Sequence, residues 1–481
     1  MSGQEGRACR AMPLKLSVGL LLLFCGNAGS QDRDDPKDLL LHARQTVLDT
    51  VRRLPRYVCT VTIDRTRYEA TTPEYLTNGR LRTRSCDDTI AEMKRAGRVR
   101  RPSSSDRLRF DVAVKQDTPG VEKEMYSWAG EDRFDDRDLL DFVRDGAIST
   151  GTFSSMLASI FGGDAARFFY SGDSSSGGRL LSEFSFSVPE EKSRYRYVFG
   201  DSALRQTPIA YDGAAFIDPE TSDLVRMAIR SRQLPPETGA CELTQFLEYD
   251  RVRLNGSDFL LPAEARVSVL RADGTEAENR IGYSACREFL GASTVRFGPP
   301  AADAASASRQ NAPPPPFPLP AGLPFKVIFT DQIDAATGAA GDPIHGRLKT
   351  AIRDRADKVL VPAGTPVTAR ILKVRRFYAQ QRPPVAESRG ARNPSLVLEV
   401  RLQTLEIGGT SQAFKAAFDS GLRRFPKQQS GPFAVRVDIG SIGRPEDSGN
   451  DREIGTFEFW DPSPGFIVKA GLESNWVTLA P

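Results

Sequence analysis

The chain has 481 residues, of which 40% are hydrophobic and 26% charged, and its formal net charge at pH 7 is +3. This length is enough for two or three ordinary domains, each with its own buried core. Acidic and basic residues are nearly balanced and form no basic patch, which argues against a nucleic-acid-binding protein.

Residues 1–30 have the pattern of a secretory signal peptide. Lys15 follows an alternative start at Met12 and precedes an apolar run, Leu16–Gly26, that is too short to cross a bilayer as a mature helix. Small residues then lead to an expected cleavage site at 28–30. We therefore predict an exported protein, periplasmic or secreted, with no transmembrane anchor in the mature chain.

Cys25 raises the alternative of a lipoprotein anchored through that thiol. Phe24 precedes it and is bulkier than the small residue that lipoprotein processing normally takes, which disfavours the anchor. Without the anchor, Cys9 and Cys25 both leave with the signal peptide.

Four cysteines then remain in the mature chain: Cys59, Cys86, Cys241 and Cys286. An even number in an exported chain predicts disulfides, and four cysteines allow three pairings. We favour the pairing of sequence neighbours, Cys59 with Cys86 and Cys241 with Cys286, because it closes the shortest loops. The wide spacing of the cysteines and the presence of only two histidines disfavour a metal site, and we expect no cofactor.

Residues 31–297 are predicted to form one β domain that begins with a helix. Asp35 suits the cap of this helix and Pro36 its first position, and Pro55 ends it after about five turns. Its apolar stripe consists of Leu40, Ala43, Val47, Val51 and Leu54.

From residue 57 onward, apolar and polar residues mostly alternate, which predicts a large antiparallel sheet with one buried face. Turn residues separate the strands, including Asn255-Gly256, a pair that favours a two-residue hairpin. The expected strands cover 57–68, 107–116, 121–130, 180–189, 194–200, 209–218, 223–232, 241–254, 259–270 and 278–289.

A helical pattern interrupts these strands at residues 151–163. Its apolar residues share one face, which is usual for a core helix and also suits a helix that lines a ligand cavity. Our candidate ligand-binding residues are Phe153, Met156, Leu157, Ile160 and Phe161.

No motif in the chain indicates a catalytic site. Ser174 lies in a Gly-Asp-Ser sequence, but no histidine is expected near it, so we interpret 171–178 as a Ser/Gly-rich loop. The carboxylates of 131–141 would suit a glycosidase pair or a calcium site, although interleaved arginines favour a solvated helix start. We expect a non-catalytic protein, with a secreted hydrolase that uses these carboxylates as the alternative.

Residues 298–321 are rich in Pro, Ala and Ser, which predicts an extended interdomain linker. Strand patterns resume in 322–481 and are interrupted by polar inserts at 379–394 and 424–452, which we interpret as loops. We predict a second, small β-barrel or sandwich here. Its Pro-Ala-Gly-Thr-Pro sequence at 362–366 is expected to be a structural turn between two strands.

The order of elements from 36 to 297 resembles the LolA/RseB-like periplasmic proteins, in which a leading helix precedes a strongly curved, incompletely closed antiparallel barrel. The segments that carry the likeness are 211–230, an aromatic-Asp-Gly strand feeding an Asp-Pro hairpin, 247–267 and 278–289. The resemblance implies an envelope protein whose barrel takes acyl chains or the hydrophobic segment of a partner.

Segments 341–352, 358–371 and 395–409 resemble the small β-barrel of TrbI-like channel proteins, which implies subunit or envelope contacts. We do not extend this likeness to a secretion role, because no membrane anchor is expected in the mature chain. The sequence therefore predicts an exported, non-catalytic protein of a bacterial cell envelope that binds a lipid, a lipoprotein segment or an envelope protein. A purely structural envelope scaffold is a further alternative.

Overall fold

The computed structural model describes residues 35–71, 82–97, 100–118, 121–131, 134, 153–199, 205–232, 234–289, 318–379, 394–419, 451–460, 462–463 and 465–480. The predicted signal peptide, Cys25 and most of the linker and of the two polar inserts lie outside these residues. Among the helices of the described part, none combines the length and hydrophobicity that crossing a membrane requires.

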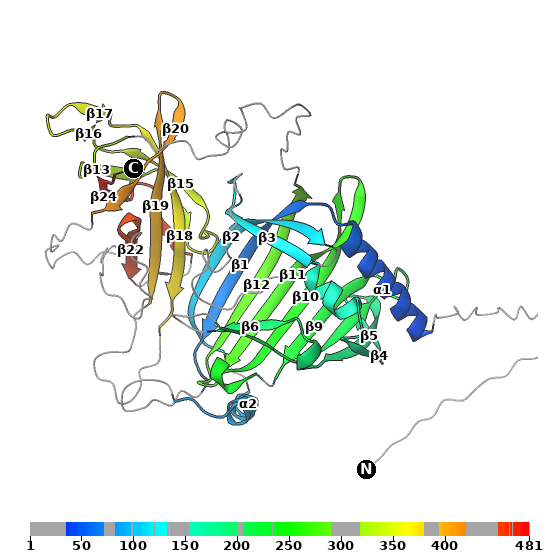
Figure 1. Ribbon diagram of the computed structural model, residues 1–481. Coiled ribbons are helices and arrows are strands. Elements are labelled where there is room, and N and C mark those ends of the chain that lie inside the picture. The colour runs from blue at the N-terminus through cyan, green and yellow to red at the C-terminus, as the bar shows by residue number, and fades with distance from the viewer. Residues whose placement is uncertain are drawn as a thin grey trace, which may run out of the picture.

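The N-terminal unit is an antiparallel sheet that curves without closing, which confirms the predicted half-barrel (Figure 1). From one free edge to the other, its strands follow the order β4-β5-β8-β9-β10-β11-β12-β1-β2-β3. Their bounds are β1 Tyr57–Tyr68, β2 Pro102–Thr118, β3 Val121–Trp128, β4 Arg167–Ser176, β5 Arg179–Val188, β8 Tyr211–Ile217, β9 Leu224–Ser231, β10 Ala240–Leu254, β11 Ser257–Arg271 and β12 Glu276–Glu288. A small separate hairpin pairs β6 Arg196–Phe199 with β7 Arg205–Pro208.

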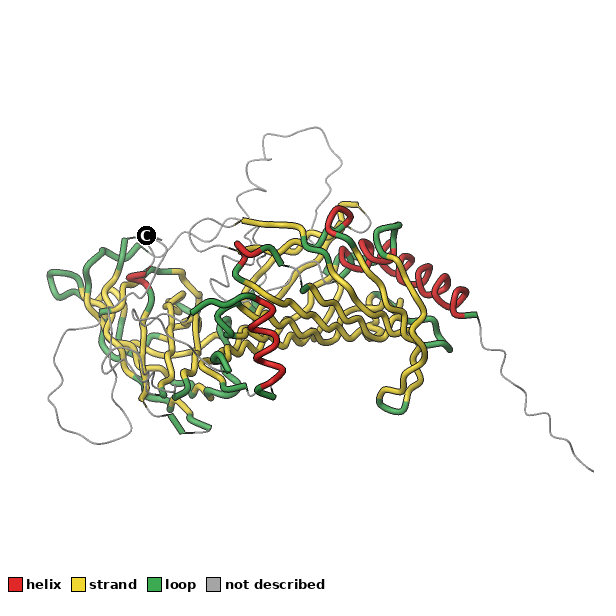
Figure 2. Tube along the Cα trace, turned by 90° about the horizontal axis from the view of Figure 1, so that it is seen from below, coloured by secondary structure: helices red, strands yellow, loops and turns green. Residues whose placement is uncertain are grey.

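The α-helices among the described residues of this unit are α1 Pro36–Arg53, α2 Cys86–Arg95 and α4 Ser155–Phe161. Asp35 caps α1 through a hydrogen bond from the Lys37 amide, and Ala43, Val47 and Val51 of its stripe are buried, as the sequence predicts. Seen from below, α1 lies along one face of the long sheet (Figure 2). The hydrophobic face of the sheet is thus covered by helices, and over β10 and β11 also by the segment that carries the β6–β7 hairpin.

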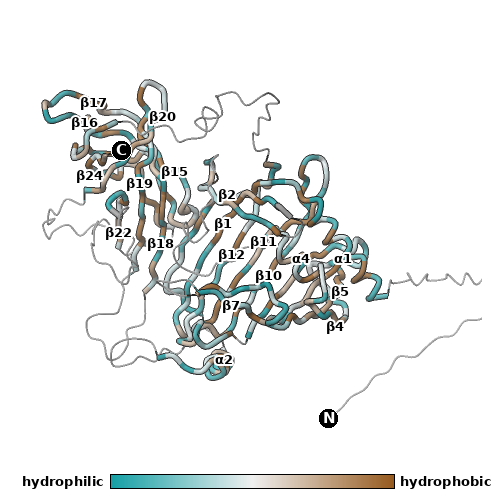
Figure 3. Tube along the Cα trace, in the orientation of Figure 1, coloured by the Kyte–Doolittle hydropathy of each residue, from teal (hydrophilic) through white to brown (hydrophobic). Residues whose placement is uncertain are grey.

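Alternation of buried and exposed residues is clear along β10 and β11, as the hydropathy colouring also shows (Figure 3). Asn255 and Gly256 join these strands with φ angles of 48° and 80°, which the predicted two-residue hairpin needs.

Both disulfides differ from the predicted pairing: Cys59 is bonded to Cys286, and Cys86 to Cys241. In chain order, β1 is the first strand of the half-barrel and β12 the last, and the two are neighbours in the sheet. The Cα atoms of Cys59 and Cys286 therefore lie 4.0 Å apart despite a separation of 227 residues. Short loops were the wrong criterion because the order of strands, not the distance along the chain, decides which cysteines meet.

Two further elements depart from the sequence prediction. Residues 171–176 are not a loop but part of β4, which forms a hairpin with β5 at one free edge of the sheet. Helix α2 was not expected, and its first residue, Cys86, attaches it to β10 through the bond to Cys241.

The C-terminal unit has a separate hydrophobic core, which includes the fully buried Trp476 and also Leu319 from the end of the predicted linker. Its ladders run β21-β24-β13-β15-β18-β19, and β19 also pairs with β20 and β22. The bounds are β13 Pro324–Phe329, β14 Ile333–Asp334, β15 Pro343–Leu348, β16 Ile352–Arg353, β17 Val359–Val361, β18 Pro366–Phe377, β19 Ser395–Ile407, β20 Thr410–Ala413, β21 Ala416–Phe418, β22 Gly455–Trp460, β23 Ile467–Val468 and β24 Glu473–Thr478.

The Pro-Ala-Gly-Thr-Pro segment turns the chain into β18, as predicted. Gly364 has a φ of 86°, and its amide donates a hydrogen bond of 2.7 Å to the Leu348 carbonyl. Beyond the turn, Val367, Ala369 and Ile371 are buried. The stretch is therefore structural.

Within the described residues, strand β2 pairs with strands of both units. The edge of β2 pairs with β3 over residues 110–118, and its residues 104–106 pair instead with β18. Between these ladders, Ala340 makes a parallel bridge to Leu108 and exchanges 2.8 Å hydrogen bonds with the backbone of Arg107 and Arg109. Within the described residues, the two units therefore share one sheet of 18 strands.

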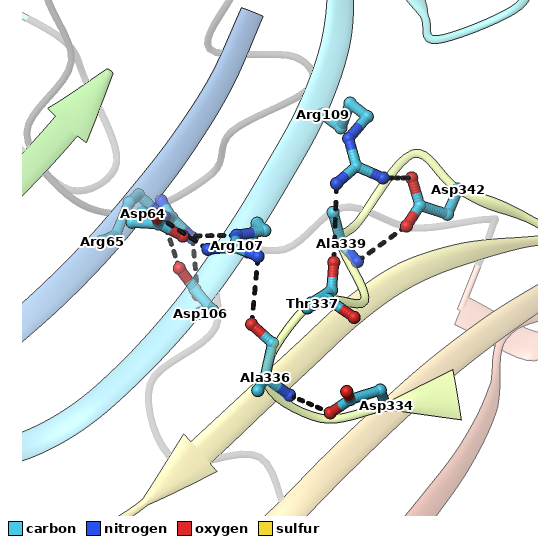
Figure 4. A network of polar contacts seen from close by, with 10 residues as sticks. All are labelled: Asp64, Arg65, Asp106, Arg107, Arg109, Asp334, Ala336, Thr337, Ala339 and Asp342. Carbon is cyan, nitrogen blue, oxygen red and sulfur yellow. Dashed lines mark hydrogen bonds and ion pairs between the residues drawn. The ribbon is translucent and has the colours of Figure 1, made fainter. Parts of the chain in front are cut away.

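Ion pairs surround this junction (Figure 4). Arg107 binds Asp64 and donates to the Ala336 carbonyl at 3.0 Å, while Arg109 binds Asp342 at 2.6 Å. Asp106 lies on the same strand and binds Arg65, at 2.6 Å, and also Arg375 of β18. Backbone and charged side chains together hold the C-terminal unit on the edge of β2.

Candidate binding site

The opening of the half-barrel, between the free edges β3 and β4, is spanned by α4. At its start, Ser154 and Ser155 bind Glu122 of β3, and at its end the Phe161 ring lies 5.4 Å from the ring of Phe168 in β4. Helix α1 lies beside α4 and contacts its C-terminal end through Arg44. Helix α4 thus closes the gap that the sheet leaves open.

Both ends of α4 are held by a charged side chain. The Glu122 carboxylate accepts hydrogen bonds from the Ser154 amide (2.5 Å), the Ser154 hydroxyl (2.6 Å) and the Ser155 amide (3.2 Å). Arg44 donates to the carbonyls of Phe161 (3.0 Å) and Gly163 (2.6 Å). The backbone amides at the start of a helix and the carbonyls at its end have no partners within the helix. Glu122 and Arg44, which we call the clamps of α4, supply these hydrogen bonds.

The five apolar residues predicted to line a ligand cavity all lie on α4 or directly before it, and all are buried. They belong to the main hydrophobic core, together with α1 and the inner face of the sheet: Phe153, Met156, Leu157, Ile160 and Phe161. In this conformation they fill the interior themselves. That they face a ligand stays a prediction.

A group of polar side chains lies within this apolar interior, next to the start of α4. We call it the tyrosine-glutamate cluster, and its members are Tyr57, Glu122, Glu124, Tyr249 and Tyr283. The Phe153 ring lies 5.8 Å from the Tyr57 ring and 5.2 Å from the Tyr283 ring, edge-on in both cases. Glu124 accepts a hydrogen bond from the hydroxyl of Tyr126.

Several polar atoms of the cluster lack a hydrogen bond. Within the described residues, the hydroxyls of Tyr57 and Tyr249 and one carboxylate oxygen of Glu122, Oε1, are buried without a partner. Such groups are rare in folded proteins and call for an explanation.

Burial raises the pKa of both phenols. The pKa of Tyr57 is well above its usual value because the ring is desolvated, and the charges of Glu122 and Glu124 raise it further. Burial likewise raises the pKa of Tyr249, with Tyr283 and Glu122 adding to the rise. The carboxylates that add to these rises, Glu122 and Glu124, therefore place negative charge beside the two phenols.

The candidate catalytic groups do not come together within the described residues. Ser174 lies on β4 at the edge of the N-terminal unit, whereas His345 lies on β15 of the C-terminal unit, where its ring binds Asp331 at 2.7 Å. Of the carboxylates at 131–141, Glu131 binds the buried Arg370 at the junction. Asp132, Asp135, Asp136, Asp138 and Asp141 lie outside the described residues.

Over the part of the chain that the structure describes, no group of three or more His, Cys, Asp or Glu side chains is arranged to hold a metal ion.

Sequence reasoning missed the clamps and the tyrosine-glutamate cluster, although one signal was present. Alternation in β3 places Glu122 and Glu124 on the same face as Tyr126, which is buried. Two carboxylates on the inner face of a strand are unusual enough to mark a polar site in the interior.

No family model and no curated protein matches the chain. Solved structures give matches over about half of it. A DUF1329 family protein from Desulfovibrio piger is 10% identical, with 53% of this chain and 95% of that chain covered and a TM-score of 0.24. An outer membrane lipoprotein-sorting protein domain from Vibrio parahaemolyticus is 10% identical, with coverages of 53% and 94% and a TM-score of 0.25.

A LolA superfamily protein from Nitrosomonas europaea is 8% identical, with coverages of 52% and 94% and a TM-score of 0.24. The matched structures thus include a protein of the LolA superfamily, which the sequence resembles. At these identities and scores, no function follows from the likeness.

Proposed function

We propose that the protein is an exported, non-catalytic binding protein of a bacterial cell envelope, and that the interior of the half-barrel takes an apolar ligand in place of α4. The ligand would be an acyl chain of a lipid or the hydrophobic segment of a lipoprotein. The observation that carries the proposal is that a short helix, held at each end by one charged side chain, fills the open side of the barrel.

The chemistry of the interior supports exchange of this helix. Each large apolar side chain that leaves the core gives up about 1.5–3 kcal/mol of hydrophobic stabilisation, so only a ligand of comparable apolar area can replace α4. Acyl chains and hydrophobic peptide segments meet this requirement, whereas small polar metabolites do not.

Two disulfides in the N-terminal unit support the exported location, because disulfides persist in oxidising compartments. We further propose that the C-terminal unit is an interaction domain that contacts another envelope protein. Its shared sheet with β2 supports this role, since the two units then present themselves to a partner as one body.

Arg44→Gln tests whether α4 controls access to the interior. Arg44 donates two charge-assisted hydrogen bonds to the end of α4, and losing about 1.5 kcal/mol there raises the open fraction about tenfold. We expect the mature chain with this change to bind a neutral apolar dye, N-phenyl-1-naphthylamine, about tenfold more tightly than the unchanged chain.

The matched control is Arg52→Gln on the same helix, because Arg52 is exposed and pairs only with the exposed Asp49 within the described contacts. This variant is expected to bind the dye like the unchanged chain. Equal effects of both substitutions, or no dye binding by any variant, would overturn the proposal. Native mass spectrometry of the chain from Gln31 onward then identifies any acyl-chain molecule that copurifies.

A further inference from the structure

We propose that the ligand is an amphiphile with a cationic head group, an ammonium on an apolar chain, and that this head group binds at the tyrosine-glutamate cluster. The inference rests on the proposed function, because α4 must leave before a ligand can enter. It adds the chemical class of the head group and the end of the interior at which this group lies.

The first argument is the set of atoms without partners. Within the described residues, the hydroxyls of Tyr57 and Tyr249 and the Oε1 atom of Glu122 are buried without a hydrogen bond even while α4 is in place. Each of these oxygen atoms can accept a hydrogen bond, and an ionised carboxylate can only accept. An ammonium group only donates, with up to three N–H groups, and can therefore supply a donor to each of these oxygen atoms.

The second argument is the manner in which α4 occupies the cluster. The Ser154 and Ser155 amides and the Ser154 hydroxyl all donate to the Oε2 atom of Glu122. When α4 leaves, this carboxylate loses every one of these donors. A ligand that replaces the helix must supply donors or a positive charge at the same place, because an unpaired buried carboxylate is strongly unfavourable.

The third argument is the aromatic surroundings. The Phe153 ring lies between the Tyr57 and Tyr283 rings, and it leaves together with α4. The space that it vacates is then flanked by two phenol rings and a carboxylate. Ammonium groups are attracted to the faces of aromatic rings, most strongly where water is excluded.

Charge also selects against the opposite class of ligand. Glu122 and Glu124 share the inner face of β3, so both contribute negative charge at this end of the interior. A phosphate or carboxylate head group would be repelled there.

The test compares three ligands with the same twelve-carbon chain, namely dodecylamine, 1-dodecanol and dodecanoate, each displacing N-phenyl-1-naphthylamine from the full mature chain. We expect dodecylamine to bind about tenfold more tightly than dodecanol, and dodecanoate most weakly. In Glu122→Gln the ratio of the amine and alcohol affinities is expected to fall towards one. The ratio is the readout because loosening of α4 in this variant changes both affinities alike.

Glu264→Gln is the matched control, since Glu264 is an exposed side chain on β11, and it is expected to keep the ratio of the unchanged chain. The double variant Tyr57→Phe/Tyr249→Phe keeps the aromatic rings and removes both unpaired hydroxyls. It is expected to lower the ratio, and it serves in place of Glu122→Gln if that variant does not fold.

Equal binding of the three ligands would overturn the head-group inference and leave the proposed function standing. Binding of none of them, together with no dye binding, would instead overturn the proposed function. Preferential binding of dodecanoate would contradict the assignment of charge directly.

Discussion

Asp106→Asn is the sharpest test of how the two units are held together. The Asp106 carboxylate lies between two guanidinium groups, Arg65 of β1 at 2.6 Å and Arg375 of β18 at 2.8 Å. The three side chains are only 6%, 10% and 12% exposed, respectively. Removing one partner from a buried ion pair leaves an uncompensated charge and costs about 3–5 kcal/mol. Here the substitution removes the negative charge that lies between the two guanidinium groups, so these groups repel each other more strongly.

The loss falls on the junction because Asp106 pairs in register with Arg375 in the β2–β18 ladder. We therefore expect the free energy of unfolding to drop by about 3–5 kcal/mol and the C-terminal unit to unfold first. Urea denaturation of the oxidised mature chain, followed by circular dichroism and by tryptophan fluorescence, measures both effects. Trp476 reports on the C-terminal core, in which it is fully buried.

Two companion variants separate the charge effect from loss of packing. Asp49→Asn removes an exposed partner of Arg52 and is expected to change stability by less than about 1 kcal/mol. Adding Arg375→Gln to Asp106→Asn removes one of the two guanidinium groups that face each other and is expected to recover part of the loss. If Asp106→Asn costs less than about 1 kcal/mol, the junction is screened by solvent and the reasoning is wrong.

Three further predictions follow from the described geometry. Gly341→Ala is expected to cost about 3 kcal/mol or more in unfolding free energy, because Gly341 has a φ of 104° and a Cβ atom there would lie 1.9 Å from the Arg109 carbonyl oxygen. Gly364→Ala, with a φ of 86° but no atom within 4 Å of the added Cβ, should cost only the backbone strain, and equal losses would contradict this account. Above pH 10 the free energy of unfolding is expected to fall by about 1.4 kcal/mol per pH unit for each buried phenol. The unfolded chain releases the phenol protons in this range, whereas the raised pKa of Tyr57 and of Tyr249 keeps them bound in the folded chain. Urea denaturation between pH 9 and 11 measures this slope, and an unchanged slope in Tyr57→Phe/Tyr249→Phe would refute it. Peptide mapping without reductant should find Cys59 linked to Cys286. Reduction of that bond alone should cost about 4 kcal/mol, because with the Cys86–Cys241 bond intact it closes a loop of about 70 residues. Recovery of Cys59 linked to Cys86 would contradict this pairing.

The sequence predicted correctly those helices and strands that are determined by the residues within them. Helix α1 begins at Pro36 after its Asp35 cap, and β1 covers the expected residues 57–68, because capping and alternation are properties of a few neighbouring residues. Strand β4 was not predicted, because its own residues lack such a pattern. It lies at a free edge, its residues Phe169 and Tyr170 are exposed, and a strand without one clearly buried face lacks the alternating signal.

Contacts between distant residues could not be predicted from local patterns. Arg44 lies off the apolar stripe of α1 and reaches the end of α4 across 117 positions. The Cys59–Cys286 bond and the pairing of β2 with β18 likewise depend on the strand order of the whole sheet. The sequence therefore predicts the apolar residues of the candidate site, but not the charged side chains, Glu122 and Arg44, that hold the two ends of α4.

Strand β2 is part of both units. Its 17 residues are continuous, and residues 110–118 pair with β3 at the rim of the half-barrel, while residues 104–106 pair with β18. An occupant that widens the half-barrel would therefore act on the same strand that pairs with the C-terminal unit. On the proposed function, we expect the orientation of the C-terminal unit to differ between the filled and the empty half-barrel.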